Sequence, residues 1–417
     1  IMPSLVGSEM CIRDSIYTEL VDTALGGTAQ DNSVSMLFAP GAKGKAPGPG
    51  GVTLEVGTSY MLTGLEDAVN LGINEEYDTT NKTPLYFNIK EFYDKADAGT
   101  KLWIYVYDKT TYAQTSKFLQ APDFLTAVRS TMETLENNRP RIIMVAQAEG
   151  QDTPTEGGLS EDTITCCTDF ESALETLFGE GIRAVGILDA AVVSGISDLP
   201  YVSKYNAPRV ALQIVTSTKT RNASVGRSGG IVSARNLATS IGNVSMGSVT
   251  TADYLVDSAS NTPVNTPVTL LTRTQTNDLG AKQYLFTLRR NDVGICYNDG
   301  ATMNSAANAL SSIDFVRVAN AVCDDCDTFF TKLLNVNIPV QSNGTINAAF
   351  KSGTLANLRS LYIDPYINRG DASQINVDFE AKDGNFVQSR ALEVTVEILP
   401  NAPMREAFIT VMFVSSL

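Results

Sequence analysis

The sequence predicts a two-part fold of the α/β and α+β classes. An inserted parallel-sheet α/β domain interrupts an α+β domain built from the N-terminal segment and the C-terminal third. Two observations predict this fold. Between about residues 62 and 216, nearly continuous apolar runs alternate with amphipathic segments, as in parallel strands that are covered on both faces. Beyond residue 284, strands instead occur in pairs around long helices. A chain of 417 residues has room for two or three domains.

The α/β domain is predicted from four apolar runs. These predicted strands are Lys101–Tyr107, Arg141–Gln147, Arg183–Leu188 and Arg209–Val215. Periodicity predicts the helices between them over Asp123–Asn137, Thr168–Glu180 and Asp198–Tyr205. The strand–helix–strand order predicts a parallel layer with right-handed crossovers.

The N-terminal region is predicted to hold little regular structure. Ile1–Ser15 looks like translated sequencing adaptor and is excluded from the fold prediction. Residues 16–60 are expected to form an N-terminal arm with a strand at Ser33–Phe38 and a Gly/Pro linker at Ala39–Gly51. That linker lacks the Gly-Lys-Ser/Thr ending of a phosphate-binding loop.

The rest of the chain completes the predicted α+β domain. The inserted domain spans 61–280, with a second half, 217–280, whose Ser, Thr, Asn and Gly content predicts loops and short strands. The domain at 281–417 carries the predicted strands Gln283–Arg289 and Val293–Tyr297, the helices Ile313–Leu334 and Ala348–Leu358, and the closing strands Leu392–Leu399 and Ala407–Val414.

Composition argues against several functions. The net charge of -15 does not favour nucleic acid as a partner, because phosphate binding needs a clustered cationic surface. No apolar run is long enough to suggest membrane insertion. The chain contains no histidine, so it lacks the commonest general base and metal ligand. Six widely spread cysteines indicate reduced thiols rather than a disulfide framework.

Two motifs suggest chemistry, but an ordinary loop is the better explanation of the first and buried helix packing of the second. Gly226-Arg227-Ser228-Gly229-Gly230 matches a nucleophile elbow, yet it has no histidine base and lies in a segment predicted to be loop. Cys323 and Cys326 are spaced like a redox pair, but they fall inside a predicted helix and lack two further zinc ligands. We therefore expect no catalytic residue, no metal and no cofactor. A Rossmann-like nucleotide-binding protein or enzyme remains the alternative, although no Gly-x-Gly-x-x-Gly follows the first strand.

An ordered series of short motifs resembles the contractile tail sheath family. The motifs are Leu65–Val69, Leu71–Ile73, Lys90–Tyr93, Gly99–Ile104, Gly247–Val249, Thr251–Tyr254, Gly294–Asp299, Ile313–Asn320 and Gly344–Ile346. Their order and spacing carry the resemblance, which covers most of residues 50–417.

The resemblance implies a structural subunit without enzymatic activity. It implies a helical homo-oligomer that surrounds a tail tube and contracts to drive the tube through a cell envelope. The implied partners are other copies of the chain, the tail tube protein, and baseplate and tail terminator proteins. The implied location is the tail sheath of a virion assembled in the bacterial host cytoplasm. A phage, a bacteriocin and a secretion apparatus all remain open.

Two sets of residues are predicted to make contacts within such an assembly. An inter-subunit strand is expected at Ala407, Phe408, Ile409, Thr410, Val411, Met412, Phe413 and Val414, because a bare apolar strand needs a ladder partner. An ordinary strand within one subunit is the alternative. Asp324 and Asp325 are expected to lie on an acidic helix surface that faces the tube.

Overall fold

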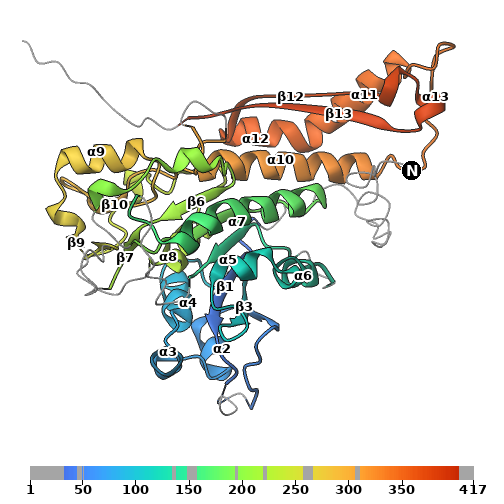
Figure 1. Cartoon of the computed structure of the whole chain (residues 1–417). Coiled ribbons are helices and arrows are strands. Elements are labelled where there is room, and N and C mark those ends of the chain that lie inside the picture. The colour runs from blue at the N-terminus through green and yellow to red at the C-terminus, as the bar shows by residue number, and fades with distance from the viewer. Residues whose placement is uncertain are drawn as a thin grey trace, which may run out of the picture.

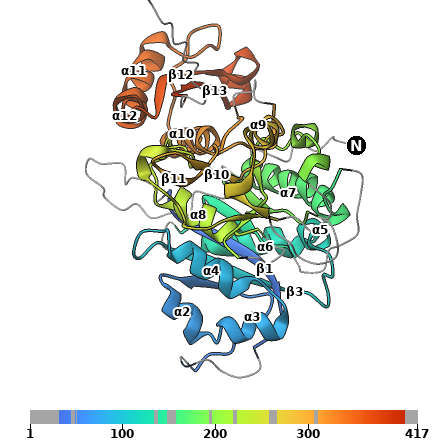
Figure 2. The same cartoon turned by 90° about the vertical axis from the view of Figure 1, so that its left-hand side faces the viewer.

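The computed structural model describes residues 32–44, 49, 51–133, 138–147, 157–192, 196–218, 223–256, 266–305 and 310–402. It confirms a mixed α/β fold that combines a parallel sheet with antiparallel sheets. Helices α2 (Leu65–Asn70) and α3 (Glu75–Asn81) lie at one end of the molecule. A long hairpin of β12 (Ala372–Ala381) and β13 (Leu392–Pro400) lies at the opposite end in both views (Figures 1 and 2).

The main sheet has six strands in the order β2-β3-β1-β4-β5-β6. These strands are β1 (Ser35–Gly41), β2 (Ser59–Leu62), β3 (Leu102–Asp108), β4 (Ile142–Val145), β5 (Val185–Asp189) and β6 (Val210–Gln213). All neighbouring pairs are parallel except β2 with β3. The four strands predicted for the α/β domain are therefore present and parallel.

The predicted place of the N-terminal strand is wrong. The strand predicted at Ser33–Phe38 forms as β1, but it pairs with β3 on one side and β4 on the other. It does not join the C-terminal third in an α+β domain. All seven residues of β1 are buried, because helices cover both faces of the sheet at its centre. A nearly continuous apolar run is the pattern of such a central strand.

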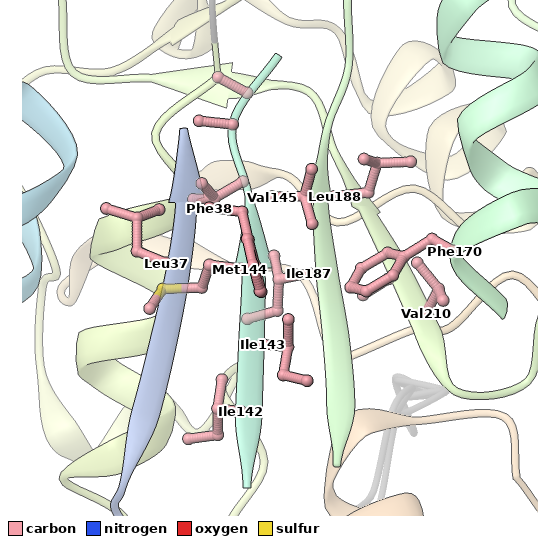
Figure 3. Close-up of a cluster of buried hydrophobic side chains, with 14 of the residues drawn as sticks. Leu37, Phe38, Ile142, Ile143, Met144, Val145, Phe170, Ile187, Leu188 and Val210 are labelled. Carbon is pink, nitrogen blue, oxygen red and sulfur yellow. The ribbon is translucent and has the colours of Figure 1, made fainter. Parts of the chain in front are cut away.

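Two helix layers bury the sheet. Helix α4 (Leu85–Tyr93) and helix α8 (Val225–Ser233) pack together on one face, while α5 (Thr115–Gln120), α6 (Pro122–Ser130) and α7 (Glu161–Gly179) cover the other. Figure 3 shows the apolar side chains between these layers, including Phe170 from α7 beside Val210. The predicted helices here are confirmed in kind but shifted: α7 begins earlier, where the Ser160 hydroxyl accepts the Thr163 N–H.

Helix α8 occupies a segment that was predicted to be loop. Every residue from Val225 to Ser233 is buried. A Cβ at Gly226 or Gly230 would overlap the carbonyl oxygens of Asn88 and Phe92 on α4. These glycines therefore allow two helix backbones to touch. The Gly-x-Ser-x-Gly pattern reflects this close contact and does not form a strand–turn–helix elbow.

Short elements connect the sheet to the C-terminal third. They are η1 (Thr131–Glu133), η2 (Ile196–Asp198), η3 (Val202–Tyr205), η4 (Val244–Met246), η5 (Val268–Leu270), β7 (Val215–Thr216), β8 (Tyr254–Leu255), β9 (Thr266–Pro267), β10 (Thr287–Arg290), β11 (Gly294–Tyr297) and α9 (Arg273–Ala281). The helix predicted at Asp198–Tyr205 is thus replaced by 3-10 turns. The strand pair predicted after residue 283 is confirmed as the antiparallel pair β10–β11.

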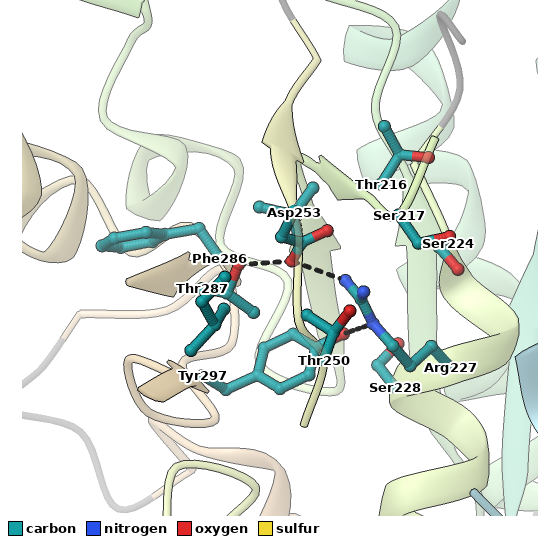
Figure 4. A network of polar contacts seen from close by, with 12 residues as sticks. Thr216, Ser217, Ser224, Arg227, Ser228, Thr250, Asp253, Phe286, Thr287 and Tyr297 are labelled. Atoms are coloured by element: carbon teal, nitrogen blue, oxygen red, sulfur yellow. Dashed lines mark hydrogen bonds and ion pairs between the residues drawn. The ribbon is translucent and has the colours of Figure 1, made fainter. Parts of the chain in front are cut away.

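A buried ion pair holds this connecting region against α8. The Arg227 guanidinium donates to the Asp253 carboxylate at 2.7 Å, and Thr287 of β10 donates to the same oxygen (Figure 4). Arg227 also donates to the Tyr297 hydroxyl at 3.3 Å, and among the described residues it is the largest fully buried side chain. Burial is the largest single effect on the pKa of Arg227 and lowers it, but Tyr297 and Asp253 together raise the pKa above its ordinary value. The guanidinium therefore joins α8, β10 and β11 into one unit.

The C-terminal third forms a separate layer over the α/β part. Its elements are α10 (Ile313–Thr331), α11 (Ala348–Leu358), the π-helix η6 (Arg359–Ile363), α12 (Asp364–Arg369), β12, η7 (Lys382–Gly384), α13 (Phe386–Ser389) and β13. Helix α10 lies between the α/β part and the outer layer of α11, α12 and the hairpin (Figure 1). The two predicted helices and the closing strand Leu392–Leu399 are confirmed, whereas β12 was not predicted.

Candidate assembly surface

Helix α10 connects the two parts of the molecule. Ile313 and Val316 near its start belong to the large core around the sheet. Val322 and Phe329, further along, belong to a second core that includes Tyr362 and Ile375. One helix therefore contributes to both cores and determines how the outer hairpin sits on the α/β part.

A buried cluster of ion pairs fixes α10 to the sheet. The Asp324 carboxylate accepts hydrogen bonds from Arg141 and Arg183, the latter at 2.7 Å, and Arg139 lies 3.8 Å away. Arg183 also pairs with the exposed Asp327. Burial lowers the pKa of Arg141 to about 10, which Asp324 partly offsets. The cluster links the amino ends of β4 and β5 to the middle of α10.

The predicted acidic surface is therefore not formed by Asp324. Its side chain is fully buried among arginines. Asp325 is half-buried and accepts a hydrogen bond from the Tyr366 hydroxyl at 2.6 Å; burial raises its pKa. Helical spacing is the signal that could have shown that Asp324 is buried. Asp324 lies seven residues after Arg317, about two helical turns, and both are on the buried side of α10. That α10 faces a tube stays a prediction.

The prediction that Cys323 and Cys326 lie inside a helix is confirmed. Cys323 and Cys326 both lie inside α10, and Cys326 is buried in the second core. Burial raises the pKa of both thiols, to about 12 for Cys326. Within the described ranges, no cluster of three or more candidate ligands could hold a metal ion.

The hairpin β12–β13 is the outermost feature of this layer. Ile375, Phe379 and Ala381 point into the cores, and the residues that alternate with them are exposed. Strand β13 alternates in the same way between half-buried Leu392, Val394, Val396 and Ile398 and exposed neighbours. In the part of the chain that the structure describes, the sheet holds these two strands. Each therefore presents one edge whose backbone groups have no strand partner within that part.

Six exposed large apolar side chains lie in the same third of the chain, while others, such as Leu270 and Met246, lie elsewhere. Val387 is 60% exposed, Leu399 59% and Leu361 57%. Leu334, Val336 and Val340, which follow α10, are also exposed. A two-stranded sheet is marginal by itself, and this one has open edges and apolar neighbours. The hairpin has the properties of a surface that other strands complete.

The predicted inter-subunit strand at Ala407–Val414 lies outside the described residues. The closing hairpin ends at Pro400, and the described chain ends at residue 402. The assignment of this strand to a neighbouring subunit or to its own subunit stays a prediction.

The carboxyl edge of the sheet, where α/β proteins bind nucleotides, is filled by the chain's own side chains. The Asp162 carboxylate accepts the backbone N–H groups of Thr115 at 2.9 Å and Ser116 at 3.1 Å, at the start of α5. A bound phosphate would need those same N–H groups as hydrogen-bond donors, and Asp162 already occupies them. Tyr107 is buried beside them and hydrogen-bonded to Thr115. This arrangement does not favour the nucleotide-binding alternative.

Asp189, at the end of β5, is a second buried carboxylate at this edge. It accepts N–H groups from Ala223 at 2.8 Å and Gln147 at 3.2 Å. Burial raises its pKa to about 8, although these hydrogen bonds act in the opposite direction. Sequence reasoning missed Asp189, because a single Asp at a strand end carries no distinctive pattern. Its contacts hold loop backbones in place.

Comparisons with known proteins identify the fold. No protein-family model matches the chain, and no curated protein matches it by sequence. A chain in the anti-feeding prophage baseplate is similar over 100% of both chains, with a TM-score of 0.58 and 12% identity. The contracted PVC sheath of an extracellular contractile injection system matches 100% of this chain and 99% of its own, with a TM-score of 0.54 and 11% identity.

This chain has the contractile sheath fold. The sheath tail protein of Desulfitobacterium hafniense is also similar, over 92% of this chain and 100% of its own, with a TM-score of 0.51 and 9% identity. The sheath fold thus extends across the α/β part and the C-terminal third together. No helix in the described ranges has the length and apolarity needed to span a membrane.

Proposed function

We propose that this protein is the structural subunit of a contractile sheath. Copies of the chain would polymerise helically around a tube, and contraction of the polymer would drive the tube through a cell envelope. The observation that carries the proposal is the match of the entire chain, rather than one domain, to sheath proteins of two contractile systems. The baseplate and a tail terminator are the proposed further partners.

The hairpin supports this role physically. The edges of β12 and β13 have no strand partner among the described residues, and such edges gain backbone hydrogen bonds when a further strand aligns beside them. Ala407–Val414 has the composition of such a strand, with seven apolar residues and no charge. We propose that it pairs with the β12–β13 sheet of a neighbouring copy. In this proposal the subunit has no enzymatic activity and needs no cofactor, and contraction releases energy stored in subunit packing.

The proposed location is the sheath of a phage-like tail or extracellular injection particle, assembled in the host cytoplasm. The rival function, nucleotide binding by a Rossmann-like protein, has no supporting site at the filled carboxyl edge. Calorimetric titration with nucleotides tests it directly: no heat of binding is expected, and saturable binding would revive it.

Negative-stain electron microscopy of the purified full chain tests the main proposal. We expect ordered helical polymers at high protein concentration. A variant lacking residues 406–417 should remain folded, with an unchanged circular dichroism spectrum, and should no longer polymerise. A Thr395→Ala variant, changed on the exposed face of β13, is the control that should still polymerise. A chain that stays monomeric at every concentration would contradict the sheath proposal. Unchanged polymerisation of the truncated chain would contradict only the strand assignment.

A further inference from the structure

A small pocket lies where α10 crosses the amino ends of the central strands. Its wall includes Arg141 and Arg183, which precede β4 and β5, and Arg317 of α10. Asn320 and Ala321, also on α10, complete this side. The pocket lies at the opposite edge of the sheet from the filled carboxyl edge. It therefore differs from the nucleotide site considered above.

Sheet register brings two of these arginines together. The Arg141 N–H donates to the Val34 carbonyl at 2.8 Å, and the Val185 N–H donates to the Arg141 carbonyl at 2.9 Å. Arg141 is thereby fixed between β1 and β5, and Arg183 lies two residues before β5 begins. Arg317 reaches the same space from α10. Three guanidinium groups thus converge from separate elements.

The lining of the pocket contains positive charge and no carboxylate. Asp324 neutralises part of this charge from one side, through Arg141 and Arg183, and Asp327 pairs with Arg183 as well. Arg317 is fully buried, and its two Nη groups donate to the backbone carbonyls of Asn236 at 3.3 Å and Arg235 at 3.1 Å. Within the described part of the chain, the Nε atoms of Arg183 and Arg317 are buried without an acceptor.

The electrostatic cost of this arrangement is visible at Arg317. Burial lowers its pKa to about 10, and Asp314 and Asp371 offset only part of that effect. A buried donor without an acceptor costs about 1–3 kcal/mol, more when the donor is charged. An anion in the pocket would supply acceptors and compensate the charge.

The size of the pocket limits what can enter it. Its volume is about 10 Å³, close to the space of one water molecule or one oxygen atom. Guanidinium groups match the planar geometry of carboxylates and the oxygens of phosphate. We propose that the pocket binds a single oxyanion, with one oxygen between Arg183 and Arg317 and the rest of the ion at the mouth. The source is either a free oxyanion such as phosphate or sulfate, or a carboxylate side chain of a second copy.

Thermal unfolding of the full chain in millimolar sulfate tests the pocket. Sodium chloride at matched ionic strength is the reference, because sulfate also stabilises proteins non-specifically at higher concentration. We expect a saturable rise of the unfolding midpoint in sulfate. Arg317→Met should weaken the apparent affinity for sulfate at least tenfold. Arg359→Met, which removes an exposed arginine, is the matched control and should respond like the wild type.

A second variant covers the case in which Arg317→Met fails to fold. Asn320→Asp is isosteric and places a carboxylate at the pocket wall. It should raise the midpoint without sulfate and abolish the sulfate response. Asn277→Asp on the exposed face of α9 is its control, with an unchanged response. Equal sulfate responses of the wild type and both pocket variants would overturn the proposal.

Measuring how sulfate affects association of the chain distinguishes the two possible sources of the oxyanion. If a carboxylate of a second copy is the ligand, sulfate at saturating concentration should raise the protein concentration needed for association, and chloride should not. If a free oxyanion is the ligand, sulfate should bind without that effect. Midpoints measured on the dissociated chain do not depend on the sheath proposal, so failure of either proposal can be recognised separately.

Discussion

The central strand β1 and the closing strand β13 show how differently the two parts of this molecule are stabilised. Every residue of β1 is buried, whereas β13 has no fully buried residue and alternates between half-buried and exposed positions. β1 has a strand partner on each side, and β13 has one in the described chain. The α/β part therefore holds its own fold, while the hairpin is left with capacity for further partners.

The predicted effects of mutation follow this difference. Changes inside the α/β part should cost most of the stability of the chain, and changes on the hairpin should cost little. Equal effects in the two parts would contradict the comparison.

The largest effect is expected for Arg227→Leu. This change leaves the Asp253 carboxylate buried without its cation, at a cost of about 3–5 kcal/mol. Urea unfolding should show the loss as a lower midpoint. The Asp253→Asn/Arg227→Leu double variant should recover part of the stability, because the unpaired buried carboxylate is then removed. If Arg227→Leu lowers the stability no more than the replacement of an exposed arginine does, the stabilising role of this ion pair is contradicted.

A somewhat smaller cost is expected for Gly226→Ala. The added methyl group must push α8 away from α4, which should cost about 3 kcal/mol. Gly353→Ala in α11 is the matched control, because nothing lies within 4 Å of its new Cβ. Alanine favours helix over glycine by about 1 kcal/mol, so this control should be slightly stabilising. Unfolding midpoints that change in opposite directions would support the close helix contact.

The next effect depends on pH and concerns Asp189. Its pKa in the folded state is about 8, above the unfolded value, so the folded state holds the proton more tightly. Stability from this group is therefore fully present below about pH 4, falls as the pH rises to about 8, and then stays constant. The Asp189→Asn variant should lose less stability than the wild type between pH 6 and pH 9, by on the order of 2 kcal/mol. Parallel pH profiles of the two proteins would contradict the assignment.

The smallest effect is expected on the hairpin. Glu393 lies directly across from Glu380, and like charges in that position are unfavourable. Glu393→Lys should raise stability by about 0.5 kcal/mol. Glu397→Lys, opposite the neutral Asn376, is the control and should change stability less. A large loss for either variant would show that the hairpin is more tightly packed than β13 indicates.

The sequence predicted the parallel strands well because burial on both faces leaves unbroken apolar runs. It could not place β1, because the same run is compatible with either domain and pairing is set by distant strands. Helix α8 was missed because Gly226 and Gly230 look like loop residues unless the neighbouring backbone of α4 is known. β12 was missed although Ile375, Phe379 and Ala381 alternate with exposed polar residues, and its bulge between Ala372 and Gln374 lies only at the start of the strand.

The candidate site was predictable only in part. An apolar strand near the end of the sequence indicated a need for strand partners, and the open hairpin supplies edges of the required kind. The ion pairs of Asp324 were not predictable, because Arg141 and Arg183 are separated from it by more than a hundred residues. A run of aspartates in a helix suggests a hydrated surface until tertiary contacts place one of them inside.

The Asp324 cluster has a mechanical consequence. A pull on the hairpin reaches the sheet through α10, and α10 is tied to β4 and β5 by side-chain ion pairs as well as by the covalent chain. Such ties resist shear between layers, yet they can break and re-form without unfolding either layer. The resistance of the molecule to load across its two layers therefore includes a reversible part, the ion pairs of Asp324, beside the apolar packing of Ile313 and Val316.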